Sequence, residues 1–177
     1  MKLSIRLSHL VSGVQSLNIG TGHKVYHGNL ELGTVNAWAI QTRDLASIRV
    51  PNQPRVTDDV EHDLNARDVT NVTSSYDEGE LRCMTGISTW WTECGTIQYP
   101  LLLNVACQLT SIDGMVRVLI ESIGGDSGGP LYRYIQSENV VRAAGITSCG
   151  GDNPVTHTDY QRIDYVPASW DLSISTS

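Results

Sequence analysis

The sequence predicts an all-β fold built from short antiparallel strands. Short apolar runs alternate with Gly, Pro and Asn or Asp turns along most of the chain. The composition agrees, because 16 glycines and scattered Val, Ile and Thr favour strands and turns over helices. With 40% apolar and 18% charged residues, the 177 residues suffice for one domain or for two small halves that share a core. These observations favour an antiparallel sandwich or a pair of barrels.

The individual strands follow from the apolar runs and from the residues that end them. Pro51 ends the run at 45–50 and, with Pro54, opens an acidic stretch that has few large apolar residues. We therefore predict a connection between two halves at 53–79, with one strand inside it at 69–72. Only 168–174 is predicted to be helical. The other strands are predicted at 3–7, 29–32, 45–50, 95–98, 101–106, 115–120, 131–135 and 140–147.

The charge balance argues against two classes of partner. The net charge is −7, and the chain has only 12 Lys and Arg residues. Binding to nucleic acid or to an anionic membrane depends on clustered basic residues, so we expect neither partner. No stretch approaches the ~20 apolar residues that a membrane-spanning helix needs. We expect a monomer.

The amino end and the cysteines bear on the compartment. Arg6, Ser8 and His9 interrupt any apolar run near Met1, so this segment does not predict a signal peptide. Two interpretations stay open: a cytosolic protein, or a sequence that lacks its true beginning. The four cysteines, at 83, 94, 107 and 149, allow three pairings, and none has the Cys-x-x-Cys spacing of zinc or redox sites. No metal or cofactor is expected, because no His, Cys and Asp cluster has ligand spacing.

The segment Gly125-Asp126-Ser127-Gly128-Gly129-Pro130 is the strongest indication of chemistry. A serine hydroxyl is a poor nucleophile unless a base removes its proton and donors stabilise the developing oxyanion. Gly125 allows a backbone conformation in which its N–H points where the N–H of Ser127 points. Gly128 and Gly129 let a substrate backbone come close. We therefore predict Ser127 as a nucleophile, with an oxyanion hole formed by Gly125 and Ser127.

Two orders of a catalytic triad fit this motif. The Gly-x-Ser-x-Gly elbow of α/β-hydrolases would use Asp152 and His157, which follow Ser127. That elbow needs a long helix after the serine, whereas residues 131–134 read as a strand. The second order is His, Asp, Ser on two packed β-barrels. Asp44 fits it, because it stands at the start of the apolar strand 45–50, which would bury and orient the carboxylate.

With these motifs in place, the sequence resembles the chymotrypsin-like serine proteases, and among them the bacterial streptogrisin and alpha-lytic protease branch and its fungal relatives. The resemblance covers roughly residues 30–170 and is most specific around Ser127 and the segment that begins at Cys83. The matching blocks are Asp44–Ile48, Cys83–Gly86, Trp91–Thr96, Gly114–Arg117, Gly125–Pro130, Gly145–Ser148 and Tyr160–Gln161.

The resemblance implies a fold of two packed antiparallel β-barrels of chymotrypsin type. The first half would span 1–52 and the second, which carries the nucleophile, 80–177. It also implies a secreted serine endopeptidase that hydrolyses polypeptides through an acyl-enzyme on Ser127, with Asp44 in the triad and a disulfide between Cys83 and Cys94. Two alternatives stay open for the first barrel: it is complete as given, or it is truncated at its amino end.

The histidine is the open position of the triad. The family motif, Thr-Ala-Ala/Gly-His-Cys, is absent as such. The best match is His23, which lies 21 residues before Asp44 in the segment Gly20-Thr21-Gly22-His23-Lys24. The alternatives are a histidine upstream of Met1 and His9. His27 and His62 are expected to be ordinary surface residues.

Four positions lie near the expected substrate site, and among them Glu121 and Cys149 depart from the family pattern. Glu121 stands near the specificity pocket, where it is either an exposed carboxylate or a residue that favours a basic substrate side chain. Ser148 would offer its backbone to the substrate, and Gly150 would leave the pocket mouth open. Cys149 has Cys107 as one candidate disulfide partner.

Another departure concerns the residue before the nucleophile. Met84 replaces an arginine that, in the bacterial branch, pairs with the aspartate at the position of Asp126. Arg82 is expected to point to the opposite face of its strand. A buried, unpaired Asp126 is costly, so we expect an imperfectly formed pocket. These departures leave one alternative function, a catalytically impaired homologue that binds peptides or proteins.

Overall fold

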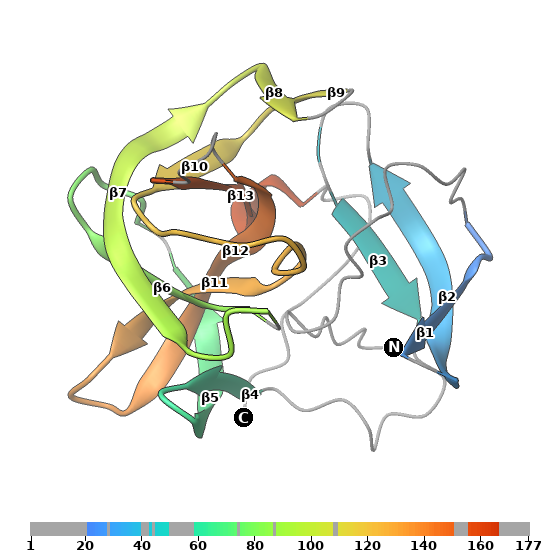
Figure 1. The fold of residues 1–177 in the computed structure, drawn as a ribbon, viewed down its shortest axis with the longest axis horizontal. Coiled ribbons are helices and arrows are strands. Elements are labelled where there is room, and N and C mark those ends of the chain that lie inside the picture. The colour runs from blue at the N-terminus through green and yellow to red at the C-terminus, as the bar shows by residue number, and fades with distance from the viewer. Residues whose placement is uncertain are drawn as a thin grey trace.

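The structure is a computed structural model, and it describes residues 21–27, 29–39, 43, 45–49, 59–73, 75–86, 88–107, 110–150 and 156–166. This part of the chain is nearly all β, which confirms the predicted fold class (Figure 1). Its only helix is a short 3-10 turn, and none of its helices could span a membrane. The elements are β1 (Lys24–His27), β2 (Leu30–Ala39), β3 (Leu45–Arg49), β4 (Asp59–His62), β5 (Asn65–Val72), β6 (Leu81–Thr85), β7 (Thr92–Leu102), β8 (Val105–Cys107), β9 (Thr110–Ile112), β10 (Met115–Val118), β11 (Pro130–Ile135), β12 (Val140–Gly150), β13 (Thr158–Arg162) and η3 (Ile163–Tyr165).

Six strands of the second half form a closed antiparallel barrel. They pair in the order β11, β6, β7, β10, β13 and β12, and the pairing of β11 with β12 closes the ring. One buried cluster draws residues from all six strands, among them Met84, Leu131 and Tyr160, and therefore fills the barrel interior. The strands predicted at 95–98, 115–120, 131–135 and 140–147 all overlap strands of this barrel.

The acidic stretch before the barrel contains a β-hairpin. Strands β4 and β5 pair antiparallel, and β5 then pairs parallel to β12, with Val69 opposite Val141. Val60 and Val69 are 3% and 4% exposed, so these two residues supply the apolar contacts that hold the hairpin on the barrel. The predicted strand at 69–72 is thus the end of a longer strand, and part of the predicted connection belongs to the main sheet.

A second buried cluster lies on the outside of the barrel. Successive side chains of a strand point to opposite faces, so Tyr132 faces outward where its neighbour Leu131 faces inward. Tyr132 shares the outer cluster with Val69 of the hairpin and with Leu45 of β3. This cluster joins the first half of the chain to the barrel.

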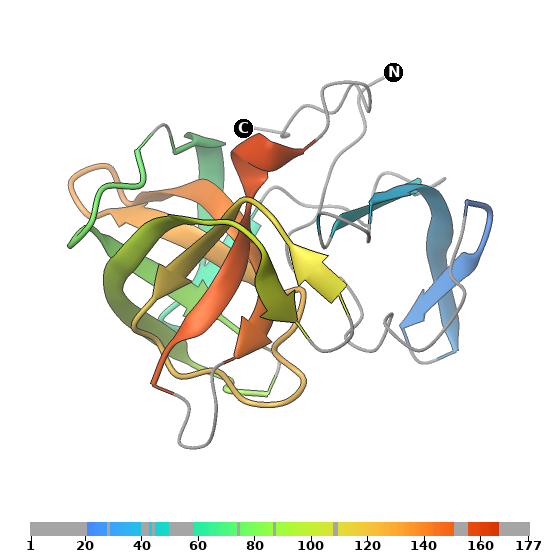
Figure 2. The same cartoon turned by 90° about the horizontal axis from the view of Figure 1, so that it is seen from above.

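The first half contributes a separate sheet, in which β2 lies between β1 and β3 and all pairings are antiparallel. Figures 1 and 2 show this sheet, in blue, beside the barrel in both views. The strands predicted at 29–32 and 45–50 fall in it. The predicted strand at 3–7 and the predicted helix at 168–174 lie outside the described residues.

Candidate active site

The predicted nucleophile lies in the loop between β10 and β11. Gly125 has φ +107° and Gly128 has φ +84°, values in the left-handed region that side chains other than glycine rarely adopt. These two positions explain why the loop needs glycine on both sides of Ser127. Ser127 itself is half-buried, and Pro130 begins β11 directly after the loop.

Asp126 is 1% exposed and holds two loops together. Its Oδ1 accepts hydrogen bonds from the backbone N–H groups of Ser88, at 2.8 Å, and Thr89, at 3.1 Å. Its Oδ2 accepts a third from the N–H of Ile123, at 3.0 Å. Because Ser88 and Thr89 belong to the loop between β6 and β7, the carboxylate ties that loop to the nucleophile loop.

The expectation that Asp126 lacks a partner is therefore wrong. Three backbone N–H groups satisfy the carboxylate where the related enzymes are expected to use an arginine, and charge-assisted bonds of this kind are about twice as strong as neutral ones. Met84, at the replaced position, is fully buried and accepts a hydrogen bond from the hydroxyl of Tyr160. The expectation for Arg82 is also wrong, because it lies two residues before Met84 on β6 and therefore on the same face; it bonds to Glu80 at 2.9 Å.

The backbone N–H groups of the loop divide into two sets. Those of Asp126, Gly128 and Gly129 donate to backbone carbonyls. Within the described part of the chain, those of Gly125 and Ser127 have no acceptor, and the Ser127 hydroxyl has no hydrogen-bond partner. The two N–H groups predicted to receive an oxyanion are thus unoccupied donors beside the predicted nucleophile.

The nucleophile loop is also fixed to β12. The N–H of Gly128 donates to the carbonyl of Thr147 at 2.8 Å, and the N–H of Thr147 donates to the carbonyl of Gly129 at 2.9 Å. The Thr147 hydroxyl adds a bond to the same carbonyl at 3.1 Å. These contacts hold Ser127 next to the part of β12 that carries Ser148.

The predicted substrate-binding residues lie on two segments, the start of this loop and the end of β12. Glu121 is exposed and follows β10, whereas Ser148 is half-buried in β12. Gly150 is exposed at the end of β12 and pairs with Thr158 of β13. The Thr158 hydroxyl lies 2.8 Å from both the carbonyl oxygen of Ile120 and the hydroxyl of Ser122, so β13 braces the segment that carries Glu121.

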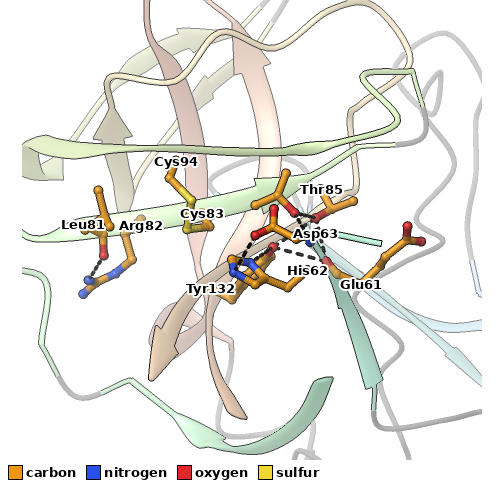
Figure 3. Close-up of a disulfide and its surroundings, with 10 residues drawn as sticks. Glu61, His62, Asp63, Leu81, Arg82, Cys83, Thr85, Cys94 and Tyr132 are labelled. Carbon is orange, nitrogen blue, oxygen red and sulfur yellow. Dashed lines mark hydrogen bonds and ion pairs between the residues drawn. A yellow bond between two sulfur atoms is a disulfide. The ribbon is translucent and has the colours of Figure 1, made fainter. Parts of the chain in front are cut away.

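Two disulfides flank the site, and Figure 3 shows one of them. Cys83 and Cys94 are directly opposite on β6 and β7 and are joined, so the loop that donates to Asp126 is closed at its base. Cys107 and Cys149 form the second disulfide, which links β8 to β12 beside Ser148. Of the three pairings that the sequence leaves open, the structure contains Cys83 with Cys94 and Cys107 with Cys149.

His62 is not the surface residue that the sequence suggests. It is 6% exposed, and its Nδ1 lies 3.1 Å from the hydroxyl of Tyr132 (Figure 3). Its ring stacks on Tyr134 at 4.1 Å between centroids. Burial lowers its pKa, while the nearby carboxylate of Asp63 acts in the opposite direction. The Tyr132 hydroxyl also bonds to Thr85 at 3.0 Å, so this cluster joins the β4–β5 hairpin to the strand that leads into the 86–91 loop.

The candidate base lies next to the other sheet. His23 is exposed and immediately precedes β1, and its carbonyl accepts a hydrogen bond from the N–H of Val35 at 2.8 Å. Asp44 and His9 lie outside the described residues. The structure therefore brings together Gly125, Ser127 and Ser148, and it leaves the assignment of the base and of its carboxylate as a prediction.

Comparison with solved structures identifies the fold. Thermobifida fusca Protease A matches with a TM-score of 0.72 at 27% identity, over 89% of this chain and 80% of that one. A Nocardiopsis protease matches with the same TM-score at 26% identity, again over 89% and 80%. This chain has the fold of the bacterial chymotrypsin-like serine proteases. A Cellulomonas bogoriensis chymotrypsin, at 24% identity and a TM-score of 0.72 over 89% and 81%, agrees in fold.

The chymotrypsin-like resemblance read from the sequence is thereby confirmed for the fold. No protein-family model matches the sequence, and no curated protein matches it either. The alternative of an α/β-hydrolase is wrong, because Ser127 is followed by the antiparallel strand β11 where that fold needs a helix.

Proposed function

We propose that the protein is a serine endopeptidase with Ser127 as its nucleophile. The observation that carries the proposal is the pair of unoccupied N–H groups, those of Gly125 and Ser127, beside a half-buried hydroxyl. One oxyanion donor of this kind is typically worth about 3 kcal/mol of transition-state stabilisation. The serine proteases among the solved structures support the same reaction class.

In the proposed reaction, Ser127 Oγ attacks the carbonyl carbon of a peptide bond while the base takes its proton. The tetrahedral oxyanion accepts hydrogen bonds from the N–H groups of Gly125 and Ser127. The base then returns the proton to the leaving amine, which leaves an acyl-enzyme. Water, deprotonated by the same base, attacks the acyl carbon, and the carboxylic acid and free Ser127 result.

His23 is the proposed base and Asp44 the proposed carboxylate that orients it. This assignment depends on their order and spacing before Ser127, since the position of His23 at the start of β1 does not test it. His9, or a histidine outside this sequence, would take the same role if His23 does not.

Glu121, Ser148 and Gly150 are the proposed substrate contacts. Ser148 follows Thr147, which bonds to Gly128 and Gly129, so a substrate chain along this part of β12 would reach Ser127. Two disulfides favour an oxidising compartment, which supports the proposal that the protein is secreted.

A fluorophosphonate probe tests the nucleophile, because it reacts only with an activated serine. We expect one equivalent of label on Ser127, and no label on the Ser127→Ala variant. His23→Ala should abolish labelling and His9→Ala should not. If the folded wild-type protein is not labelled but still binds unfolded polypeptide, the endopeptidase proposal is wrong. The protein would then be the non-catalytic homologue that binds peptides.

A further inference from the structure

Three arginines form a row across neighbouring strands of the barrel. Arg133 of β11 is directly opposite Arg142 of β12. On its other side, β11 pairs with β6 through Leu131 opposite Met84 and Tyr132 opposite Cys83. The same register continued by one residue sets Arg133 against Arg82, so the row runs over β6, β11 and β12.

The alternation of side chains places all three on one face. Cys83, Tyr132 and Val141 belong to the cluster outside the barrel, so their sequence neighbours Arg82, Arg133 and Arg142 face the other way. That face carries Met84 and Leu131, which lie in the barrel interior. The three arginines therefore lie on the face of the sheet that lines the barrel interior, beyond the apolar side chains that fill it.

The charges of the row are not balanced by the protein. Glu80 is the carboxylate that reaches it, with Oε2 2.9 Å from Arg82 and Oε1 3.5 Å from Arg133. Among the described residues, Arg142 has no hydrogen bond or ion pair, and its Nε is buried without a partner. Of the three guanidinium groups, two contact this one carboxylate and the third has no ion pair, in a chain whose net charge is −7.

This arrangement is unfavourable without a further anion. Like charges directly opposite on neighbouring strands destabilise a sheet, and a buried polar group without a partner adds its own cost. Arg82 is fully buried, and its Nη atoms donate to Glu80 and to the backbone carbonyls of Leu81 and Ser75, but its Nε has no partner. Burial lowers the pKa of Arg82 and the charge of Arg133 lowers it further, while Glu80 opposes both.

A small ion could reach the row from solvent. The Arg133 side chain is 40% exposed, and Arg133 and Glu80 both line a surface cavity beside the Cys83–Cys94 disulfide. Arg82 and Arg142 do not line this cavity, so an ion would meet the row first at Arg133. The planar fork of arginine matches the oxygen atoms of phosphate and sulfate. The excess of two positive charges equals the charge of one such dianion.

We propose that Arg82, Arg133 and Arg142 form a binding site for one tetrahedral dianion, of the phosphate or sulfate class. The site is formed by the barrel and is separate from the nucleophile loop. The Ser127→Ala variant should therefore bind the anion as the wild-type protein does.

The test measures thermal unfolding of the full chain in sodium phosphate and in sodium chloride at equal ionic strength, near pH 7. For the wild type we expect a saturable rise of the midpoint in phosphate, about 3–6 °C at ten times the dissociation constant. Arg142→Gln and the more exposed Arg133→Gln should lose this rise. In chloride alone, Arg142→Gln should unfold at the same or a higher temperature than the wild type, because it removes an unpaired charge.

Arg49→Gln is the matched control, because Arg49 is exposed on β3 and far from the row in sequence. It should keep the full wild-type rise, and calorimetric titration with phosphate should give one site in this variant and none in Arg133→Gln. Phosphate stabilises proteins generally, so equal rises in wild type, Arg133→Gln and Arg142→Gln would overturn the proposal. The absence of any difference between phosphate and chloride for the wild type would overturn it as well.

Discussion

The carboxylate of Asp126 fills the space that a side chain at position 86 would occupy. A Cβ atom built on Gly86 would collide with the Oδ1, Cγ and Cβ atoms of Asp126. The two residues are 40 positions apart in the sequence, yet each limits what the other can be. The loop after β6 and the loop before β11 thus form one structural unit beneath Ser127.

Gly86→Ala should damage this unit. We expect a loss of about 1–3 kcal/mol in the free energy of unfolding, because the new methyl group forces the Asp126 carboxylate to move. If Ser127 is the nucleophile, the displacement should also slow fluorophosphonate labelling about 100-fold. Gly124→Ala is the control, since a Cβ there meets no atom within 4 Å. Equal losses in the two variants would contradict the predicted contact.

Asp126→Asn should leave part of the three-donor arrangement unsatisfied. One amide oxygen can still accept from Ser88 and Thr89, but the amide nitrogen cannot accept from Ile123. We expect a loss of about 1–3 kcal/mol, and a larger loss for Asp126→Ala, which removes all three acceptor contacts. Urea unfolding at neutral pH measures both. Wild-type stability in the Asn variant would mean that the carboxylate charge is unimportant there.

The two disulfides should differ in their contribution to stability. They join cysteines that are 11 and 42 residues apart, and a cross-link restricts the unfolded chain more when it closes a longer loop. Replacing Cys107 and Cys149 by alanine should therefore cost about 4 kcal/mol, against about 3 kcal/mol for Cys83 and Cys94. Urea unfolding of the two double variants gives the order. The reverse order would show that contacts in the folded state outweigh the effect of loop length on the unfolded chain.

His62 should make the protein less stable in mild acid. Because burial lowers its folded pKa below the unfolded value near 6.5, the unfolded chain binds the proton more readily. The resulting loss in the free energy of unfolding is absent above pH 7 and grows as the pH falls through 6.5, by at most about 1.4 kcal/mol per pH unit. Urea unfolding at pH 7.5 and 5.5 should show a smaller drop for His62→Gln than for the wild type. Identical drops would exclude His62 as the source.

The nucleophile segment could be predicted because its requirements are local. Gly125 and Gly128 have positive φ, and Pro130 starts a strand, as the order of residue types implies. The Cys83–Cys94 disulfide, which the family resemblance implied, falls in one hairpin, where the two cysteines lie directly opposite each other.

The support for Asp126 could not be predicted in the same way. Two of its three partners are backbone N–H groups of a loop 37 and 38 residues earlier, and any residue type except proline provides such a donor. Because Met84 stands where an arginine was expected, the sequence suggested that Asp126 has no partner. Backbone N–H groups in fact take the place of that arginine. The only signal was Gly86 itself, whose missing side chain leaves room for the carboxylate.

By itself, the sequence determined the all-β class and the segment around Ser127, because both depend on residue types and spacing over a few positions. Only the tertiary structure decided that Cys107 pairs with Cys149, that His62 is buried, and that three arginines lie in a row. These features depend on the register between strands distant along the chain. Barrel closure sets that register through the burial of side chains on both faces of the sheet.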